Sequence, residues 1–308
     1  MAQIEKKPVL SLCIPIYNRI AYLERQLTRF LEDKQLFEEQ VQLIVSDNCS
    51  TDDLRSCCLK YQQQGLKLTY HRNEFNLGPD GNFDWCFHHA DGKYVWLLGS
   101  DDVPVPGLLH KIVYALEESD FGWLHLSMSK QNNGLLLFDT PDDMAISVNY
   151  WVTFMSANII RTKSLKSIDL SEYRKSFLIQ VPAFLNACYS YKTNCILYLP
   201  LVFEEGSDAV NNGGYNIFEV FVTNLYGIYE SFIEKGMLSV RAYNKMIKIE
   251  YRFFLLDFII RLVILRKESN FKTDGCWRRL FKYYWDKPYF YFYLMTGLTQ
   301  RFLSKISL

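Results

Sequence analysis

The chain has 308 residues, 49% of them hydrophobic and 22% charged, with equal numbers of basic and acidic side chains. This length is enough for a full α/β domain with roughly 100 residues left over, and the composition excludes a long disordered chain. The net charge is zero, but the charged residues are unevenly distributed along the chain. Residues 241–308 carry 14 basic and five acidic side chains, a net charge of +9, so the first 240 residues carry −9.

Strand-like and helix-like segments alternate over the first 100 residues. Short apolar runs predict strands, and apolar residues at helical spacing predict the helices between them. This alternation predicts βαβ units and a Rossmann-like, mostly parallel sheet flanked by helices. The expected strands span residues 9–16, 41–46, 66–71 and 94–98, and the expected helical segments lie at 21–31, after 50, and at 83–90.

The pattern changes after residue 103. A loop with two prolines is followed by a helix at 108–116 and a strand at 123–128, and the polar turn at 131–134 suggests a hairpin. The Gly- and Asn-rich segment 206–215 is expected either to close over a ligand or to be a solvated connection. We expect a helical, basic and aromatic subregion at 236–308, after two parts of one catalytic domain at 1–125 and 126–235.

The N-terminus and the cysteines indicate the compartment. The apolar run from Val9 is soon interrupted by Pro15 and Asn18, which is not the pattern of a signal peptide. The eight cysteines have no metal-binding spacing and several lie in apolar runs. We therefore expect a reducing, cytoplasmic location.

The C-terminal subregion leaves two interpretations open. Its apolar run 253–265 contains Asp257 and Arg261 and is shorter than the roughly 20 residues that span a bilayer. It is either packed within the protein or part of a basic aromatic surface that contacts an anionic membrane, as the alternating aromatic and basic residues from Trp277 to Trp285 suggest. Binding of nucleic acid is not expected.

Polar side chains follow all four predicted strands. Because parallel strands end at the same edge of a sheet, these loops can meet at one ligand. Asp47 can accept a hydrogen bond from a base or ribose, Arg72 can bind a phosphate, and the acidic pair Asp101 and Asp102 suits a divalent cation. Each group taken alone is also what an ordinary turn or helix cap requires.

These four segments together resemble the family 2 glycosyltransferases. The residues that carry the resemblance are Ile14-Pro-Ile-Tyr-Asn-Arg, Val45-Ser-Asp-Asn-Cys-Ser-Thr-Asp, Arg72-Asn-Glu-Phe-Asn-Leu-Gly and Trp96-Leu-Leu-Gly-Ser-Asp-Asp. The resemblance covers roughly residues 8–125 and is strongest to the abequosyltransferase-like group of bacterial O-antigen synthesis. It implies a GT-A fold.

The resemblance also implies roles for individual residues. Ser100-Asp101-Asp102 stands where the family has its Asp-x-Asp motif, so Asp102 would bind Mg²⁺ or Mn²⁺ although Ser replaces the first acid. The implied nucleotide-sugar site consists of Pro15, Tyr17, Asn18, Asp47, Arg72, Asn76, Gly78, Asn82, Ser100 and Asp101.

Transfer to an acceptor hydroxyl also requires a catalytic base. The family often has an acid pair about 80 residues after the metal motif, but here that segment contains Gln180, which cannot accept a proton as a base. The remaining candidates are Asp101, Glu204, Glu205 and Asp208.

The expected activity is transfer of a hexose or deoxyhexose from a nucleotide diphosphate sugar to a lipid-linked oligosaccharide in surface polysaccharide synthesis. The enzyme would act at the inner face of the cytoplasmic membrane. Two alternatives remain: a nucleotidyltransferase, and a catalytically degenerate scaffold, which Ser100 and the missing base would suit.

Overall fold

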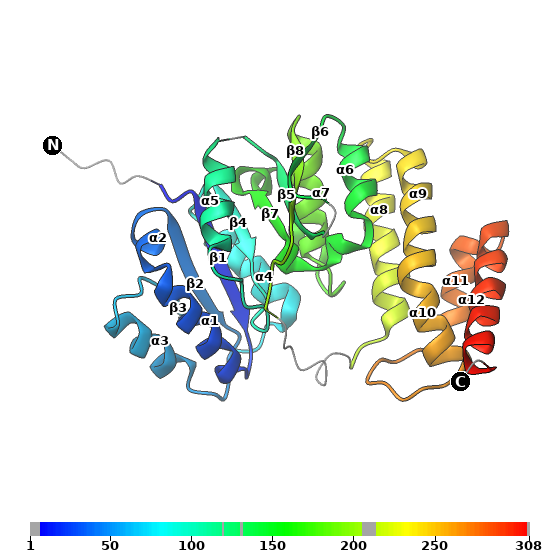
Figure 1. Ribbon diagram of the computed structural model, residues 1–308, viewed down its shortest axis with the longest axis horizontal. Helices are drawn as coiled ribbons and strands as arrows, with labels where there is room; N and C mark the ends of the chain where they lie inside the picture. Colours follow the sequence, from blue (N-terminus) through cyan, green and yellow to red (C-terminus); the bar gives the residue numbers. More distant parts are fainter. Residues whose placement is uncertain (1–6, 119, 130–131, 205–213, 307–308) are drawn as a thin grey trace. The chain divides into compact units, whose positions relative to one another are not determined.

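The computed structural model describes residues 7–118, 120–129, 132–204 and 214–306. The chain divides into two compact units, which are coloured along the sequence in Figure 1. Unit 1 comprises Met1–Met144 and Trp151–Ser207, and unit 2 comprises Ala145–Tyr150 and Asp208–Leu308. The segments α6 (Pro141–Val148) and η1 (Asn149–Thr153) lie where the chain passes between the units.

Unit 1 is built on one eight-stranded sheet with the order β3-β2-β1-β4-β7-β5-β8-β6. The pairings β1 with β2, β1 with β4, β2 with β3 and β5 with β8 are parallel, and only β6 and β7 run against the other strands. The expected α/β fold is therefore confirmed. The strands are β1 (Leu10–Ile16), β2 (Val41–Asp47), β3 (Thr69–Arg72), β4 (Tyr94–Leu97), β5 (Trp123–Met128), β6 (Gly134–Phe138), β7 (Asn158–Arg161) and β8 (Asn194–Leu199).

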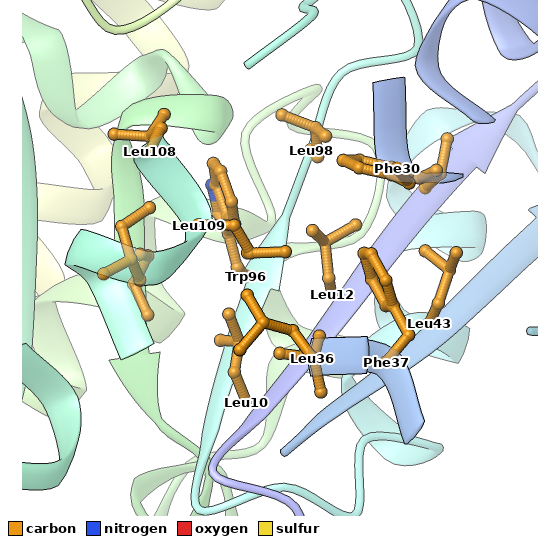
Figure 2. Packing of buried hydrophobic residues seen from close by; sticks show 14 of the residues in the cluster. Leu10, Leu12, Phe30, Leu36, Phe37, Leu43, Trp96, Leu98, Leu108 and Leu109 are labelled. Carbon is orange, nitrogen blue, oxygen red and sulfur yellow. The ribbon is translucent and has the colours of Figure 1, made fainter. Parts of the chain in front are cut away.

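Helices cover both faces of this sheet, which explains why all seven residues of β1 are buried. Leu10 and Leu12 point to a core formed with α1, α2 and α5, and Figure 2 shows Phe30, Phe37 and Trp96 packed there. Cys13 points to the other face, where its thiol donates to the carbonyl of Cys86 in α4 at 3.9 Å. The helices of unit 1 are α1 (Ile20–Glu32), α2 (Lys34–Glu39), α3 (Leu54–Gln63), α4 (Gly78–His88), α5 (Leu108–Glu118), η2 (Met155–Ala157), η3 (Thr162–Ser167), η4 (Leu170–Tyr173) and α7 (Gln180–Ser190).

The order of the central strands creates a place for a ligand. After β1 the chain adds β2 and then β3 on one side, and β4 pairs with the opposite side of β1. At such a reversal of strand order the loops diverge and leave a crevice at the carboxyl ends of the strands. The loops after β1, β2, β3 and β4 all start at this edge.

The hairpin expected at residues 131–134 is wrong. β6 pairs with β8 and not with β5, because β8 lies between them and is parallel to β5. Gly134 has a left-handed φ of 100° and begins β6, but a local turn signal does not determine which strand takes the neighbouring position.

Unit 2 is helical, as expected for the C-terminal subregion. One continuous helical run extends from Val240 to Ile264 and contains two π-helical stretches. No helix in the described part of the chain is both long and apolar enough to span a membrane. The segments are η6 (Glu219–Asn224), α8 (Leu225–Glu234), α9 (Val240–Glu250), η7 (Tyr251–Leu255), α10 (Leu256–Phe258), η8 (Ile259–Ile264), α11 (Cys276–Tyr284) and α12 (Pro288–Ile306).

Candidate active site

The loop between β1 and α1 connects the two sides of the sheet edge. Asn18 has a left-handed φ of 51°, its backbone N–H donates to Ser50 Oγ at 2.9 Å, and its Oδ1 accepts from Thr51 N at 2.7 Å. The next residue, Arg19, extends toward the loop after β4, where its Nη1 lies 3.3 Å from Asp101 Oδ2 and 3.4 Å from Ser100 Oγ. Asn18 and Arg19 therefore join the end of β2 to the end of β4.

Asp47 is the last residue of β2 and is fully buried. Its Oδ1 accepts from Ser50 N at 2.8 Å, and its Oδ2 accepts from Tyr70 OH at 2.7 Å and Arg72 Nη1 at 2.9 Å. Burial and the bond to Asp47 raise the pKa of Tyr70. The guanidinium of Arg72 also donates to Ser50 O at 2.7 Å while its side chain stays 45% exposed. Asp47 thus orients Arg72, and its own contact with a base or ribose stays a prediction.

Replacing Asp47 with Ala is expected to destabilise unit 1 as well as the site. Ser50 N and Tyr70 OH would lose their acceptor, and a lost buried hydrogen-bond partner costs about 1–3 kcal/mol. Urea denaturation should show a lower midpoint, whereas Asp52→Ala, which removes the acceptor of the exposed bond from Ile20 N, should change the midpoint less. Equal shifts in the two variants would contradict this role of Asp47.

Asn82 lies on the face of α4 that meets the sheet. Its Oδ1 accepts from Ser46 Oγ at 2.6 Å and from Asn73 Nδ2 at 3.1 Å, and its Nδ2 donates to Ser46 O at 3.0 Å. Asn82 is 3% exposed. In the structure it ties β2 to α4, and a contact with the nucleotide stays a prediction.

The turn that leads into α4 is held by a second group of amides. Asn48 Nδ2 donates to Asn76 Oδ1 at 2.9 Å and to the carbonyl of Gly78 at 3.1 Å. Asn76 Oδ1 also accepts from Gly78 N at 2.8 Å, and Gly78 has a φ of 71° that favours glycine. The predicted residues Asn76 and Gly78 therefore lie beside the loop after β2.

The acidic pair follows β4, and its second member is folded back into the protein. Ser156 Oγ accepts from Gly99 N at 2.8 Å and donates to Asp102 Oδ2 at 2.5 Å. Gln26 Nε2 donates to the carbonyls of Gly99 and Asp102, both at 2.7 Å. A side chain at position 99 would place its Cβ 2.6 Å from Asp102 Oδ2, so only glycine allows this arrangement.

The environment of Asp102 fits a cation ligand. Its pKa is raised to about 6, mainly by burial and also by the charge of Asp101, although the bond from Ser156 and the charge of Arg19 both lower it. No hydrogen bond from the described residues reaches its Oδ1. Among those residues no three His, Cys, Asp or Glu side chains are close enough to hold a metal by themselves. One carboxylate is nevertheless sufficient where substrate phosphates and water complete the shell, as is common for Mg²⁺.

The candidate bases differ in their surroundings. Asp101 is paired with Arg19, and Glu204 lies 3.9 Å from Arg25 with its side chain 40% exposed. Glu205 and Asp208 lie outside the described residues, as does most of the segment 206–215. Gln180 begins α7 and is buried, and its Oε1 has no hydrogen-bond partner among the described residues.

The residues predicted to bind the nucleotide sugar therefore lie at one edge of the sheet. Pro15 is buried opposite Ser46, and Tyr17 beyond it is 45% exposed. Three residues that organise this edge were not among the predicted site residues. Arg19 stands next to Asn18 in the first quoted motif. The available signal was that a cation in one loop can pair with the acidic pair in another loop at the same sheet edge. Gln26 and Ser156 carry no local signal, because their partners are 73 and 54 residues away.

A cavity of about 770 Å³ adjoins this edge at Gly78. One wall is α4, including Trp85, whose ring is stacked between those of His71 and His89 at 3.9 and 3.8 Å. The other wall comes from Arg174, Lys175 and Phe177 before α7. This volume and the mixture of aromatic, basic and acidic groups are typical of a small-ligand pocket.

The cavity's second wall is held by Asp80 of α4. Its carboxylate accepts from Phe177 N at 3.0 Å and from Ile179 N at 3.3 Å. Lys175 and Phe177 have left-handed φ values of 71° and 62°, so this segment needs such support. Burial raises the pKa of Asp80, and these backbone donors lower it.

Comparison with known proteins gives matches in agreement with this geometry. The model of the family described as "Glycosyl transferase family 2" matches residues 11–167. Abequosyltransferase RfbV of Salmonella typhimurium is 38% identical over 95 residues, which are 30% of this chain and 28% of that protein. The GalNAc(5)-diNAcBac-PP-undecaprenol beta-1,3-glucosyltransferase of Campylobacter jejuni is 29% identical over 120 residues, 39% of this chain and 37% of that protein. The match thus spans about a third of these relatives.

Solved structures match over more of the chain at lower identity. S. aureus TarS 1-349 has a TM-score of 0.61 at 18% identity and covers 81% of this chain and 74% of its own. The Pyrobaculum calidifontis mannosyltransferase PcManGT has a TM-score of 0.57 at 12% identity, with coverage of 98% and 89%. These likenesses show the GT-A fold. Since the family model covers just over half of the chain, the protein belongs to glycosyltransferase family 2.

Proposed function

We propose that this enzyme transfers a hexose or deoxyhexose from a nucleotide diphosphate sugar to a lipid-linked oligosaccharide in the synthesis of a bacterial O-antigen or capsule. The observation that carries the proposal is the continuous set of contacts from Arg72 through Asp47, Ser50 and Asn18 to Arg19 and the acidic pair. A site for a nucleotide diphosphate needs cationic and hydrogen-bonding groups at several positions along the ligand, and this set of residues supplies both kinds. The names of the O-antigen and undecaprenol-linked relatives support the acceptor class.

Each group would have a separate task. Arg72, half-exposed and oriented by Asp47, would bind the base or a phosphate, and Ser100 and Asp101 would lie near the ribose. Asp102 would hold Mg²⁺ or Mn²⁺, a choice supported by PcManGT, which was solved with GDP-Man and Mn²⁺. Such an ion stabilises the negative charge of the departing diphosphate. Ser156 and Gln26 would keep the Asp102 carboxylate and its backbone in place.

The roles can also be divided along the chain. We assign donor binding to residues 1–125 and acceptor binding to 126–235, which supplies Arg174, Lys175 and Phe177 to the cavity beside Gly78. The remaining residues, 236–308, would contact the inner face of the cytoplasmic membrane. The acceptor hydroxyl needs a proton acceptor, and Asp101, Glu204, Glu205 and Asp208 remain the candidates.

Thermal-shift measurements with UDP, GDP, CDP and dTDP, each with and without Mn²⁺, test the donor site. One nucleotide should raise the melting temperature by several degrees, since a ligand at about 100 times its Kd adds about 2.7 kcal/mol to stability. Mn²⁺ should increase the shift, and Arg72→Ala should reduce it, whereas Arg55→Ala on the exposed start of α3 should not. If none of the four nucleotides shifts the melting temperature, the proposed donor class is wrong.

A catalytically degenerate scaffold is the second candidate, and two observations favour it. Ser100 replaces an acid of the family motif, and Gln180 occupies the segment where the family often has its base. Sugar-nucleotide hydrolysis that depends on a divalent metal would identify an active enzyme. A protein that binds the nucleotide but neither hydrolyses nor transfers the sugar would be the scaffold. A nucleotidyltransferase would instead release inorganic pyrophosphate from a nucleoside triphosphate.

A further inference from the structure

Exposed aromatic side chains form a stripe on α11 and the start of α12. Trp277, Phe281 and Trp285 are spaced four residues apart, which places them on one side of a helix. They are 36%, 43% and 67% exposed. Tyr291, also exposed, donates from its hydroxyl to the carbonyl of Trp285 at 2.9 Å and so extends the row. We call these four residues the aromatic stripe.

The stripe is not needed to hold α11 in unit 2. The opposite side of the helix packs inward through Cys276, Leu280, Tyr283 and Tyr284, all of which are buried. Tyr284 also donates to the carbonyl of Ile247 at 2.8 Å. The hydrophobic effect disfavours leaving several large rings in water, and contiguous exposed apolar surface commonly marks an interaction site.

Basic side chains stand next to the stripe. Arg278 and Lys282 each follow one of its aromatic residues and are exposed. Within the described part of the chain neither has a carboxylate within 4.0 Å, whereas the neighbouring Arg279 is paired with Glu219. Residues 276–301 contain five basic side chains and one acid, Asp286. The partner of this surface should therefore have a negatively charged surface above an apolar interior.

We propose that the aromatic stripe docks unit 2 on an anionic phospholipid membrane, an inference that rests on the proposed lipid-linked acceptor. Tryptophan and tyrosine rings favour the headgroup level of a bilayer, and lysine and arginine beside them are attracted to anionic lipid. A second copy of this chain is a poorer occupant. A two-fold contact through the stripe would bring the Arg278 and Lys282 side chains of both copies together, and Asp286 is the one acid among residues 276–301 of each copy that could offset them.

Sedimentation of the full chain with vesicles tests this surface directly. The chain should bind vesicles of phosphatidylcholine with 30% phosphatidylglycerol and bind pure phosphatidylcholine much more weakly, and salt should reduce binding. Replacing Arg278 and Lys282 with Gln should lower partitioning about fivefold for each cation removed. Phe281→Ala with Trp285→Ala should lower it at least tenfold. Tyr114→Ala on α5 is the matched control, because Tyr114 is as exposed as Trp285, at 67%, and should leave binding unchanged.

Several results would overturn the proposal. One is that the Phe281/Trp285 variant binds vesicles as well as the wild type does, and another is that Tyr114→Ala loses as much vesicle binding as that variant. A third is that light scattering shows a dimer that Trp285→Ala dissociates. The last result would identify the stripe as a protein interface. The vesicle assay needs neither donor nor acceptor. Failure of the nucleotide screen with vesicle binding intact would therefore contradict the proposed function and leave the membrane surface in place.

Discussion

Replacement of Asp102 with Asn is expected to lower sugar transfer by about 10²–10³-fold while the fold stays intact. The loss reflects the removal of the negative charge that would hold a cation against the leaving diphosphate, and removing one such electrostatic group typically has an effect of this size. Release of nucleoside diphosphate, measured with a panel of sugar donors that carry the nucleotide found in the thermal-shift screen, reports the change.

The stability of the same variant separates catalysis from folding. Asp102 is partly buried, and burial raises its pKa, so the carboxylate is less well solvated in the folded protein than in water. The amide keeps an oxygen that can accept the bond from Ser156, and we expect no drop in melting temperature. Asp120→Asn, at a 63% exposed carboxylate of the same unit, is the control and should retain activity. Undiminished turnover of Asp102→Asn would rule out the proposed role.

The second large effect is expected at Glu250, the last residue of α9. Its side chain is fully buried, and neither carboxylate oxygen has a hydrogen-bond partner among the described residues. Burial, and after it the charge on Glu250, raises the pKa of Tyr226 and Tyr229 of α8 and of Tyr284 of α11, so these tyrosines lie near its carboxylate. Burial raises the pKa of Glu250 well above the ordinary value for glutamate.

This shift makes stability depend on pH in a definite direction. A carboxyl with a raised pKa in the folded state binds its proton more tightly there than in the unfolded chain. The stability is therefore fullest below the unfolded pKa, and it falls as the pH rises toward the folded pKa. The slope is about 1.4 kcal/mol per pH unit.

Glu250→Met should abolish this dependence and raise the stability at pH 8 by about 1–3 kcal/mol, because no unpaired polar group stays buried. Glu250→Gln keeps a polar amide, and we expect it to remove the pH slope with less gain in stability. Urea denaturation at pH 5 and pH 8 measures both effects. The prediction is contradicted if the difference in unfolding free energy between the wild type and Glu250→Gln is the same at pH 8 as at pH 5.

Much of unit 1 follows from local sequence pattern. The apolar runs that became β1, β2 and β4 are buried on both faces, and such runs need only short-range information to be recognised. The helix expected at 83–90 begins earlier, at Gly78, because Pro79 and Asp80 are well suited to a first helical turn. The polar residues that end the strands were located correctly at one sheet edge, since parallel strands bring their carboxyl ends together.

The partners of these residues were decided by the tertiary structure. Asp47 was expected to face a ligand, yet its oxygens accept three bonds from the protein, from donors up to 25 residues away. Ser156 reaches Asp102 only because β7 pairs with β4 in the antiparallel direction and brings the segment before β7 next to Gly99. Nothing in the residues near Asp102 specifies that contact.

Composition, periodicity and motif spacing were thus sufficient for the α/β class, the family resemblance, the meeting of the polar strand ends at one sheet edge and the helical basic tail. They did not predict the position of β8 between β5 and β6, the bridge made by Arg19 or the buried Glu250 among tyrosines. The difference is physical. Helix and strand preferences depend on neighbours a few residues apart, whereas strand order and buried polar contacts depend on which distant segments pack together and exclude water.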